Sequence, residues 1–280
     1  MQTKYYERAQ GTIAFSDYGN GGEPVLMLPG MGDLRAEYRY LAPKLSEAGY
    51  RAVTADLRGH GESSVPWTAY DVPSVGADIL GLIEHLNVGP VHLIGTSFSP
   101  AAAVWAAAER PDLIRSLVLI SPFVRDAKIN PLMQTLFRVM MNNPWRVRIW
   151  GTYYSSLYPS HKPPDFQGYI KQLMDNLAQP GRFDAAKGLA NASRKPSAER
   201  LKLIKTSTIV IMGTRDPDFP DPAAEGRLVA EQTGGMLAVV EGAGHYPHAE
   251  TPEKTIPIVA DFLKRGVPSE KVRVLERSAG

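Results

Sequence analysis

The sequence contains no cysteine. This absence excludes disulfide bonds, thiolate nucleophiles and cysteine-ligated zinc, although it says nothing about the cellular compartment. The chain also lacks any run of about 18 apolar residues, so no segment is predicted to span a bilayer. Residues 1–10 are polar and charged, without the apolar core of a signal peptide. We therefore expect a cytoplasmic protein with no membrane span.

A strong excess of either charge is also missing. The chain has 31 lysine and arginine residues against 29 aspartate and glutamate residues, which gives a net charge of +2. Nothing in this balance predicts an extended basic face, so we expect no nucleic-acid partner. With 280 residues, 44% of them hydrophobic, the chain is long enough for one large α/β domain that carries an inserted subdomain. The oligomeric state is not indicated.

Short apolar runs alternate with helical patterns along most of the chain. The runs predicted as strands are 24–28, 51–55, 91–96, 116–120, 207–212 and 236–240, and the segments predicted as helices are 35–48, 71–86, 100–109, 221–232 and 252–264. Strands that are apolar throughout and alternate with helices are typical of a parallel sheet covered on both faces. Residues 4–8 and 12–17 resemble an antiparallel hairpin. The predicted fold is therefore α/β, with a mostly parallel sheet of about eight strands flanked by helices.

This alternation breaks between residues 123 and 203, where prolines separate short helical segments. We expect a helical lid (123–203) inserted into a core formed by 1–122 and 204–264, and a polar C-terminal tail at 265–280. The lid is rich in methionine and aromatic residues, most of which are expected to hold it together: Met133, Leu136, Phe137, Met140, Met141, Trp145, Trp150, Tyr153, Tyr154, Leu157 and Tyr158. Its inner face is predicted to form a flexible, apolar cover over the carboxyl edge of the sheet.

One stretch, Gly95-Thr96-Ser97-Phe98-Ser99, follows a buried strand and precedes an alanine-rich helix. A sharp turn at this corner would expose the hydroxyl of Ser97 and direct the N–H of Phe98 into the same space. Gly95 provides the small residue needed where the strand and helix backbones come close together. A simple helix N-cap role for Ser97 is the alternative.

Further candidate residues follow other predicted strands. The glycine-bearing loop Pro29-Gly30-Met31-Gly32-Asp33 comes first, and it can place a backbone N–H beside a reacting carbonyl oxygen. Asp216 follows the strand 207–212, and His245 follows the strand 236–240. A serine hydroxyl needs an imidazole to accept its proton and a carboxylate to orient that imidazole. Catalytic groups in parallel sheets lie at the carboxyl ends of strands, which is where these residues fall.

With these motifs in the order serine, acid, histidine, the chain resembles the serine hydrolases of the α/β-hydrolase fold. The turn Asp56-Leu57-Arg58-Gly59-His60-Gly61 adds to the resemblance, which extends from about residue 4 to 264. It implies that Ser97 is the nucleophile, His245 the general base and acid, and Asp216 the orienting carboxylate. The backbone N–H groups of Met31 and Phe98 would form the oxyanion hole. It implies hydrolysis of an ester or lactone of a hydrophobic small molecule, without a cofactor or a metal.

Several alternatives remain open at this point. Asp218 or Asp126 can replace Asp216 as the acid, and His248 can compete with His245. His60 is interpreted as a turn residue. A metal site formed by His245 and His248 has no cysteine or helical histidine pair to support it.

The sequence also departs from the family pattern twice. Pro29 stands where a histidine often precedes the loop glycine, and Ser99 replaces the last glycine of the elbow. A similar G-x-S-x-S pattern occurs in the strigolactone and karrikin receptor branch of the fold. A ligand-sensing protein with slow hydrolysis is therefore an alternative, as is a hydrolase that acts on amide or carbon–carbon bonds.

Overall fold

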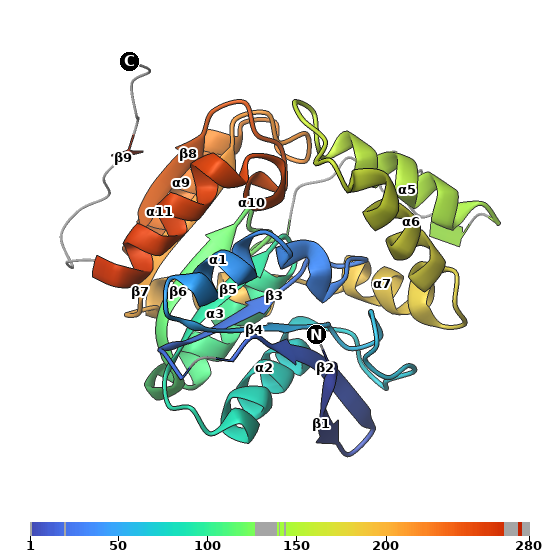
Figure 1. Ribbon diagram of the computed structural model, residues 1–280, viewed down its shortest axis with the longest axis horizontal. Coiled ribbons are helices and arrows are strands. Elements are labelled where there is room, and N and C mark those ends of the chain that lie inside the picture. The colour runs from blue at the N-terminus through green and yellow to red at the C-terminus, as the bar shows by residue number, and fades with distance from the viewer. Residues whose placement is uncertain are drawn as a thin grey trace.

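A single mixed sheet of nine strands forms the centre of the computed structural model, which describes residues 2–19, 21–126, 139, 141–142, 144–265 and 274–275 (Figure 1). The strand order is β1-β2-β4-β3-β5-β6-β7-β8-β9. The strands are β1 (Lys4–Arg8), β2 (Gly11–Asp17), β3 (Pro24–Leu28), β4 (Arg51–Ala55), β5 (Val91–Thr96), β6 (Ile114–Ile120), β7 (Ser207–Gly213), β8 (Met236–Val240) and β9 (Val274–Leu275). The strands from β3 to β9 are parallel, and β1 and β2 join them as an antiparallel pair.

The described helices are α1 (Leu41–Glu47), α2 (Val72–Leu86), α3 (Ser99–Glu109), α5 (Arg146–Ser156), α6 (Phe166–Leu177), α7 (Arg182–Asn191), α8 (Lys195–Ala198), α9 (Pro222–Thr233), α10 (Pro247–Glu250) and α11 (Pro252–Arg265), with the 3-10 helices η1 (Arg35–Tyr38), η2 (Pro111–Leu113) and η3 (Leu201–Leu203). None of the helices in the described ranges is long and apolar enough to cross a membrane.

Alternate residues of the central strands supply two separate cores. Leu26, Leu93 and Leu117 pack with α2, α3 and α9 on one face of the sheet. Their neighbours Met27 and Ile94 pack with α1 and α11 on the other. Because side chains alternate across a strand and both faces are covered, every position of β3 and β5 is buried. The predicted α/β class with a mostly parallel sheet is confirmed, as is the N-terminal hairpin.

The structure differs from prediction in the segment 35–48, which is not one helix. It forms η1 and then α1, which begins at Leu41. A continuous helix would place Pro43 in its interior, where its ring would meet the carbonyl four residues earlier. In α1, Pro43 instead falls within the first turn, where its missing N–H is not needed. The sheet also has one strand more than expected, because Val274–Leu275 pairs with β8.

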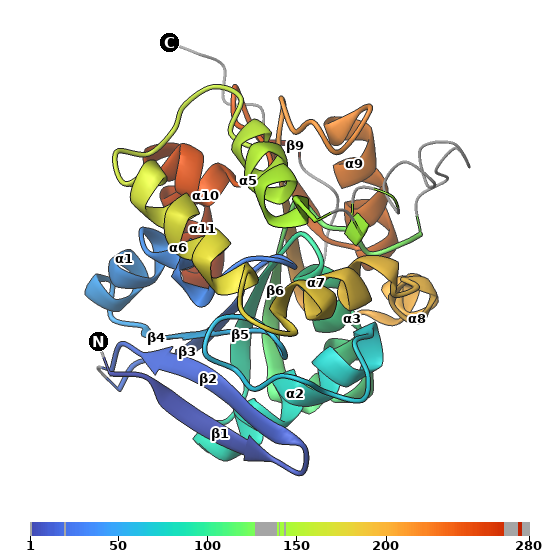
Figure 2. The ribbon, with the colours of Figure 1, turned by 90° about the vertical axis from the view of Figure 1, so that its right-hand side faces the viewer.

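Helices α5 to α8 lie between β6 and β7 in the chain, and α5, α6 and α7 form a group at one end of the sheet (Figures 1 and 2). We refer to α5 and α6, with the loop between them, as the cap. Aromatic side chains form most of its own core, including Trp150, Tyr154, Tyr158 and Phe166. Met133, Leu136, Phe137 and Met140, which the sequence analysis assigns to the lid, lie outside the described residues, as does most of the predicted tail.

Candidate functional site

Ser97 occupies the turn between β5 and α3 with a φ of 61°. A positive φ is strained for any residue other than glycine, and such strain persists only where the surroundings impose it. Two backbone hydrogen bonds hold the turn here: Ser97 donates to the carbonyl of Ile120 (2.9 Å), and its own carbonyl accepts from Phe123 (2.9 Å). The neighbouring strand end therefore fixes Ser97 on both sides.

Gly95 allows the strand and the following helix to approach each other. A Cβ atom at this position would lie 2.9 Å from the backbone nitrogen of Pro100, closer than non-bonded atoms can pack. Ser99, the residue that departs from the family pattern, is fully buried, and its hydroxyl donates a hydrogen bond to the carbonyl of Pro29. The elbow is thus tied directly to the glycine-bearing loop after β3.

The glycine-bearing loop after β3 contains a backbone N–H group, that of Met31, with no hydrogen-bond acceptor among the described residues. The N–H of Gly30 donates to Oε2 of Glu37 (2.8 Å), and the N–H of Asp33 donates to the carbonyl of Gly30. By contrast, the backbone N–H groups of Met31 and Phe98 donate to no residue in the described part of the chain. Two such N–H groups beside a serine can bind an oxygen of a ligand.

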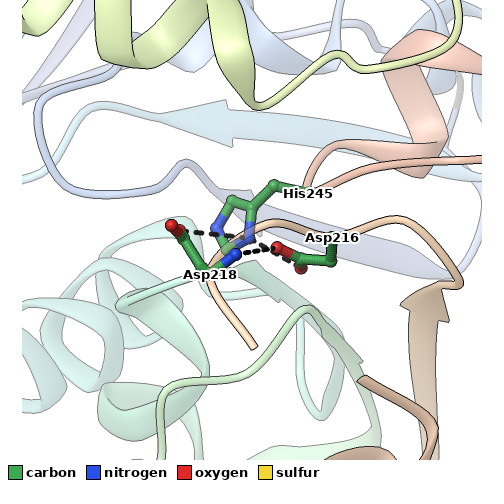
Figure 3. Close-up of side chains that lie close together, drawn as sticks. All are labelled: Asp216, Asp218 and His245. Atoms are coloured by element: carbon green, nitrogen blue, oxygen red, sulfur yellow. Dashed lines mark hydrogen bonds and ion pairs between the residues drawn. The ribbon is translucent and has the colours of Figure 1, made fainter. Parts of the chain in front are cut away.

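The structure brings His245 and Asp216 together, from the loops after β8 and β7. Nδ1 of His245 lies 2.8 Å from Oδ2 of Asp216, and both side chains are almost fully buried (Figure 3). Asp218 is also close, with its Oδ2 3.6 Å from the same nitrogen. Its backbone N–H donates to Oδ1 of Asp216 (3.0 Å). Asp216 therefore makes the hydrogen bond to the imidazole, and Asp218 contributes a second nearby carboxylate.

These contacts determine the ionisation of the histidine. Burial alone would lower the pKa of His245, but the charge and hydrogen bond of Asp216, with the charge of Asp218, raise it to about 9. Burial also raises the pKa of Asp218, although the neighbouring His245 opposes that shift. The raised pKa makes the neutral imidazole a strong base, and the two carboxylates stabilise the imidazolium that forms once it has accepted a proton.

One ligand atom each from Asp216, Asp218 and His245 lies within 4.8 Å of the others, which is close enough for a metal ion. However, Nδ1 of His245 is engaged by Asp216, and both oxygens of Asp218 accept hydrogen bonds from the Tyr153 hydroxyl (2.8 and 2.7 Å). The oxygens and the nitrogen that a metal would need thus already have partners, and the donor set does not fit a metal site.

The other candidates from the sequence lie elsewhere. Nδ1 of His60 lies 2.9 Å from the carbonyl of Arg58, and burial lowers the pKa of His60 to about 4. His248 stacks on Tyr38 and lies 2.9 Å from Glu37, and burial lowers its pKa to about 3. Asp126 instead accepts hydrogen bonds from Ser193 and Arg194. None of these contacts involves Ser97 or His245.

A pair of buried acids, Asp33 and Glu37, was not singled out by the sequence analysis. The hydroxyl groups of Tyr154 (2.8 Å) and Tyr169, both from the cap, donate to Asp33. Burial, followed by the charge of Glu37, raises the pKa of Asp33, and burial raises the pKa of Glu37. The signal available in the sequence was two acids four residues apart, directly after a buried strand and a glycine-bearing loop.

The cap contacts the loops that carry these residues. The backbone N–H of His245 donates to the carbonyl of Leu157 (3.0 Å), an approach that Gly244 permits because a Cβ there would lie 2.3 Å from the same oxygen. The Trp150 ring lies against Gly32. The rings of Phe123 and Phe219 stack on each other at 4.7 Å, and their centroids lie 5.8 and 6.4 Å from that of the His245 imidazole.

Comparisons with known proteins agree with this architecture. Residues 23–252 match the family model described as alpha/beta hydrolase fold. The 2-(acetamidomethylene)succinate hydrolase of Mesorhizobium japonicum is 27% identical, over 90% of this chain and 92% of its own length. The 3-oxoadipate enol-lactonase 1 of Acinetobacter baylyi is 24% identical, over 88% and 91%. Among solved structures, a bromoperoxidase from Bacillus anthracis superposes with a TM-score of 0.81 at 21% identity, covering 94% of this chain and all (100%) of that one.

Proposed function

Because this chain belongs to the α/β-hydrolase fold family, we propose that it is a serine hydrolase that cleaves a carboxylic ester or a lactone of a hydrophobic small molecule. The observation that carries the proposal is the Asp216–His245 hydrogen bond of 2.8 Å, together with a serine held at a φ of 61° in the turn after β5. A buried carboxylate that orients an imidazole is what a serine nucleophile requires. The enol-lactonase of Acinetobacter baylyi, similar over most of its length, supports a lactone or ester substrate.

In the proposed mechanism, Oγ of Ser97 attacks the substrate carbonyl carbon while Nε2 of His245 accepts the hydroxyl proton. The N–H groups of Met31 and Phe98 bind the oxyanion. His245 then protonates the leaving oxygen as its bond to carbon breaks, which leaves an acyl group on Ser97. Asp216 keeps Nδ1 of His245 protonated and stabilises the imidazolium. Water, activated by the same imidazole, hydrolyses the acyl-enzyme.

We propose that residues 123–203 act as a lid that receives the apolar part of the substrate. The stacked rings of Phe123 and Phe219 beside His245 support this role, as does the aromatic core of the cap. Of the acids that contact these aromatic rings, Asp218 accepts from the Tyr153 hydroxyl and Asp33 accepts from Tyr154 and Tyr169, so both already have partners within the protein. An acyl chain or a ring system of moderate size is the substrate that these surfaces fit.

The experiment is a chain-length series of p-nitrophenyl esters and of lactones, assayed with the wild type and with Ser97→Ala. We expect turnover with a preferred chain length, a burst of p-nitrophenol in the first turnover, and loss of turnover in the variant. Tight binding of these compounds with negligible turnover by the wild type would instead support a ligand-sensing protein. Undiminished turnover by Ser97→Ala would contradict the proposed mechanism.

A further inference from the structure

Tyr246, directly after His245, is an enclosed tyrosine whose hydroxyl makes no hydrogen bond to any described residue. The residue is 2% exposed, and its ring packs against Tyr154 at 5.1 Å and Tyr158 at 5.3 Å. The imidazole of His245 lies edge-on at 5.1 Å. A buried tyrosine hydroxyl normally finds a hydrogen-bond partner. Its lack of one among the described residues points to a partner that arrives with a ligand.

The other buried tyrosines of the described chain show how unusual this hydroxyl is. Tyr38 donates to the carbonyl of Leu28 (2.7 Å), and Tyr154 and Tyr169 donate to Asp33. The hydroxyl of Tyr158 lies 3.3 Å from that of Tyr154. Each of these four hydroxyl groups therefore has a protein partner, whereas that of Tyr246 has none within the part of the chain that the structure describes.

The Tyr246 hydroxyl lies beside the loop that carries the N–H of Met31. A Cβ atom built on Gly30 would be 3.3 Å from this hydroxyl oxygen, 3.1 Å from Cβ of Ser97 and 3.7 Å from Oγ of Ser97. The tyrosine hydroxyl and the serine thus border the same small space next to Gly30. Only a glycine leaves that space open.

We propose that Tyr246 is a catalytic residue whose hydroxyl is the third donor of the oxyanion hole, beside the N–H groups of Met31 and Phe98. This inference rests on the proposed serine hydrolase function. When Oγ of Ser97 bonds to the carbonyl carbon and His245 takes the serine proton, the electron pair of the C=O π bond moves to oxygen. That oxygen then accepts hydrogen bonds from three donors, and Tyr246 retains its proton throughout.

The surroundings of Tyr246 keep it in the form that can donate. Burial first, and then the charges of Asp33 and Glu37, raise the pKa of its hydroxyl above the usual range. The phenol therefore remains protonated at any pH at which His245 functions. A hydroxyl held in place before the reaction stabilises the developing charge without reorganisation.

The test is Tyr246→Phe, which removes only the hydroxyl, with Tyr158→Phe as the matched control from the same aromatic group. With p-nitrophenyl butyrate, we expect kcat of Tyr246→Phe to fall on the order of 10²-fold, as for loss of one oxyanion donor. We expect KM to change by no more than about two-fold, since the ground-state contacts remain. Inhibition by a trifluoromethyl ketone, which forms an anionic adduct with serine, should weaken by a similar factor. Denaturant unfolding should be unchanged, because no hydrogen bond within the protein is lost.

Unchanged kcat in Tyr246→Phe, or an equal fall in Tyr158→Phe, would overturn this inference. A rise in KM alone, with the trifluoromethyl ketone still bound normally, would also overturn it, because it would indicate a role in substrate packing. Ser97→Ala separates the two proposals. If Ser97→Ala is inactive and Tyr246→Phe has normal activity, the inference about Tyr246 fails but the proposed serine hydrolase function stands. If Ser97→Ala retains full activity, the proposed function itself fails.

Discussion

The hydroxyl of Ser99 donates a hydrogen bond to the carbonyl of Pro29, so the two residues that depart from the family pattern contact each other. Both are buried. The bond links the first turn of α3 to the loop that carries the N–H of Met31. The two departures from the family pattern are therefore joined by a direct hydrogen bond.

Ser99→Ala would leave the buried carbonyl of Pro29 without a donor. We expect the free energy of unfolding to fall by about 1–3 kcal/mol, the cost of an unsatisfied buried polar group. We also expect kcat for an ester substrate to fall roughly ten-fold, because the loop is no longer held in register with Ser97. Urea denaturation and steady-state kinetics measure the two effects.

Ser193→Ala is the control for this prediction, since Ser193 is exposed and its hydroxyl bonds to Asp126. Its stability is expected to stay within about 0.5 kcal/mol of the wild type. Equal stability of Ser99→Ala and the wild type would show that the Ser99–Pro29 bond does not hold the loop.

Asp216 and Asp218 are expected to have different roles. Asp216→Asn removes the partner of Nδ1 and should reduce kcat by roughly 10⁴-fold, the loss typical of the orienting acid in a triad. Asp218→Asn removes only a nearby negative charge, which destabilises the imidazolium and lowers the pKa of His245 from about 9. The acid limb of the kcat/KM profile should therefore shift to lower pH, with kcat largely retained.

The activities and pH profiles of the two variants distinguish orientation of His245 by Asp216 from orientation by Asp218 or by both carboxylates. If Asp218→Asn loses as much activity as Asp216→Asn, then both carboxylates are needed to orient His245. If Asp218→Asn is the more damaged of the two, the assignment of the acid is reversed.

Asp33 predicts how stability depends on pH. Its pKa is raised in the folded protein to about 8 by burial and by the charge of Glu37. The folded state therefore binds more protons than the unfolded state at pH values between its unfolded pKa and about 8, so stability falls as pH rises through this window. The slope from this group can reach about 1.4 kcal/mol per pH unit.

Asp33→Asn removes that ionisation while keeping an oxygen that can accept from one of the two cap tyrosines. Urea denaturation can be measured at pH values from about 5 to about 8, which lie within this window. The free energy of unfolding should depend less on pH in the variant than in the wild type. Parallel profiles for the two proteins would show that Asp33 ionises normally in the folded state.

The fold was predictable because its cause is local. The parallel strands from β3 to β8 are apolar runs, and two helices outside the cap begin at a side-chain cap, where Asp71 accepts from the N–H of Ser74 (2.8 Å) and Asp221 from that of Ala224 (2.9 Å). Ser97, Asp216 and His245 could be singled out because each follows such a run directly. The split of segment 35–48 was missed because Pro43 is tolerated in the first turn of a helix but not in its interior, and the sequence does not show at which residue the helix begins.

The remaining parts of the site depend on contacts between distant segments. Asp33 meets Tyr154 and Tyr169 from 121 and 136 residues away, and no local pattern indicates those pairs. The sequence favoured Asp216 over Asp218 only through the family resemblance, because residue spacing alone does not separate them. The two lie on one turn, and only the path of the backbone decides which oxygen comes within 2.8 Å of His245.

The most direct test of the central claim is mass spectrometry of the protein after treatment with diethyl p-nitrophenyl phosphate, which phosphorylates an activated serine. The account predicts one diethylphosphoryl group per chain, located on the peptide that contains Ser97, in proportion to the loss of esterase activity and absent from Ser97→Ala and His245→Ala. Modification of another residue with loss of activity, or full activity after Ser97 is modified, would contradict it.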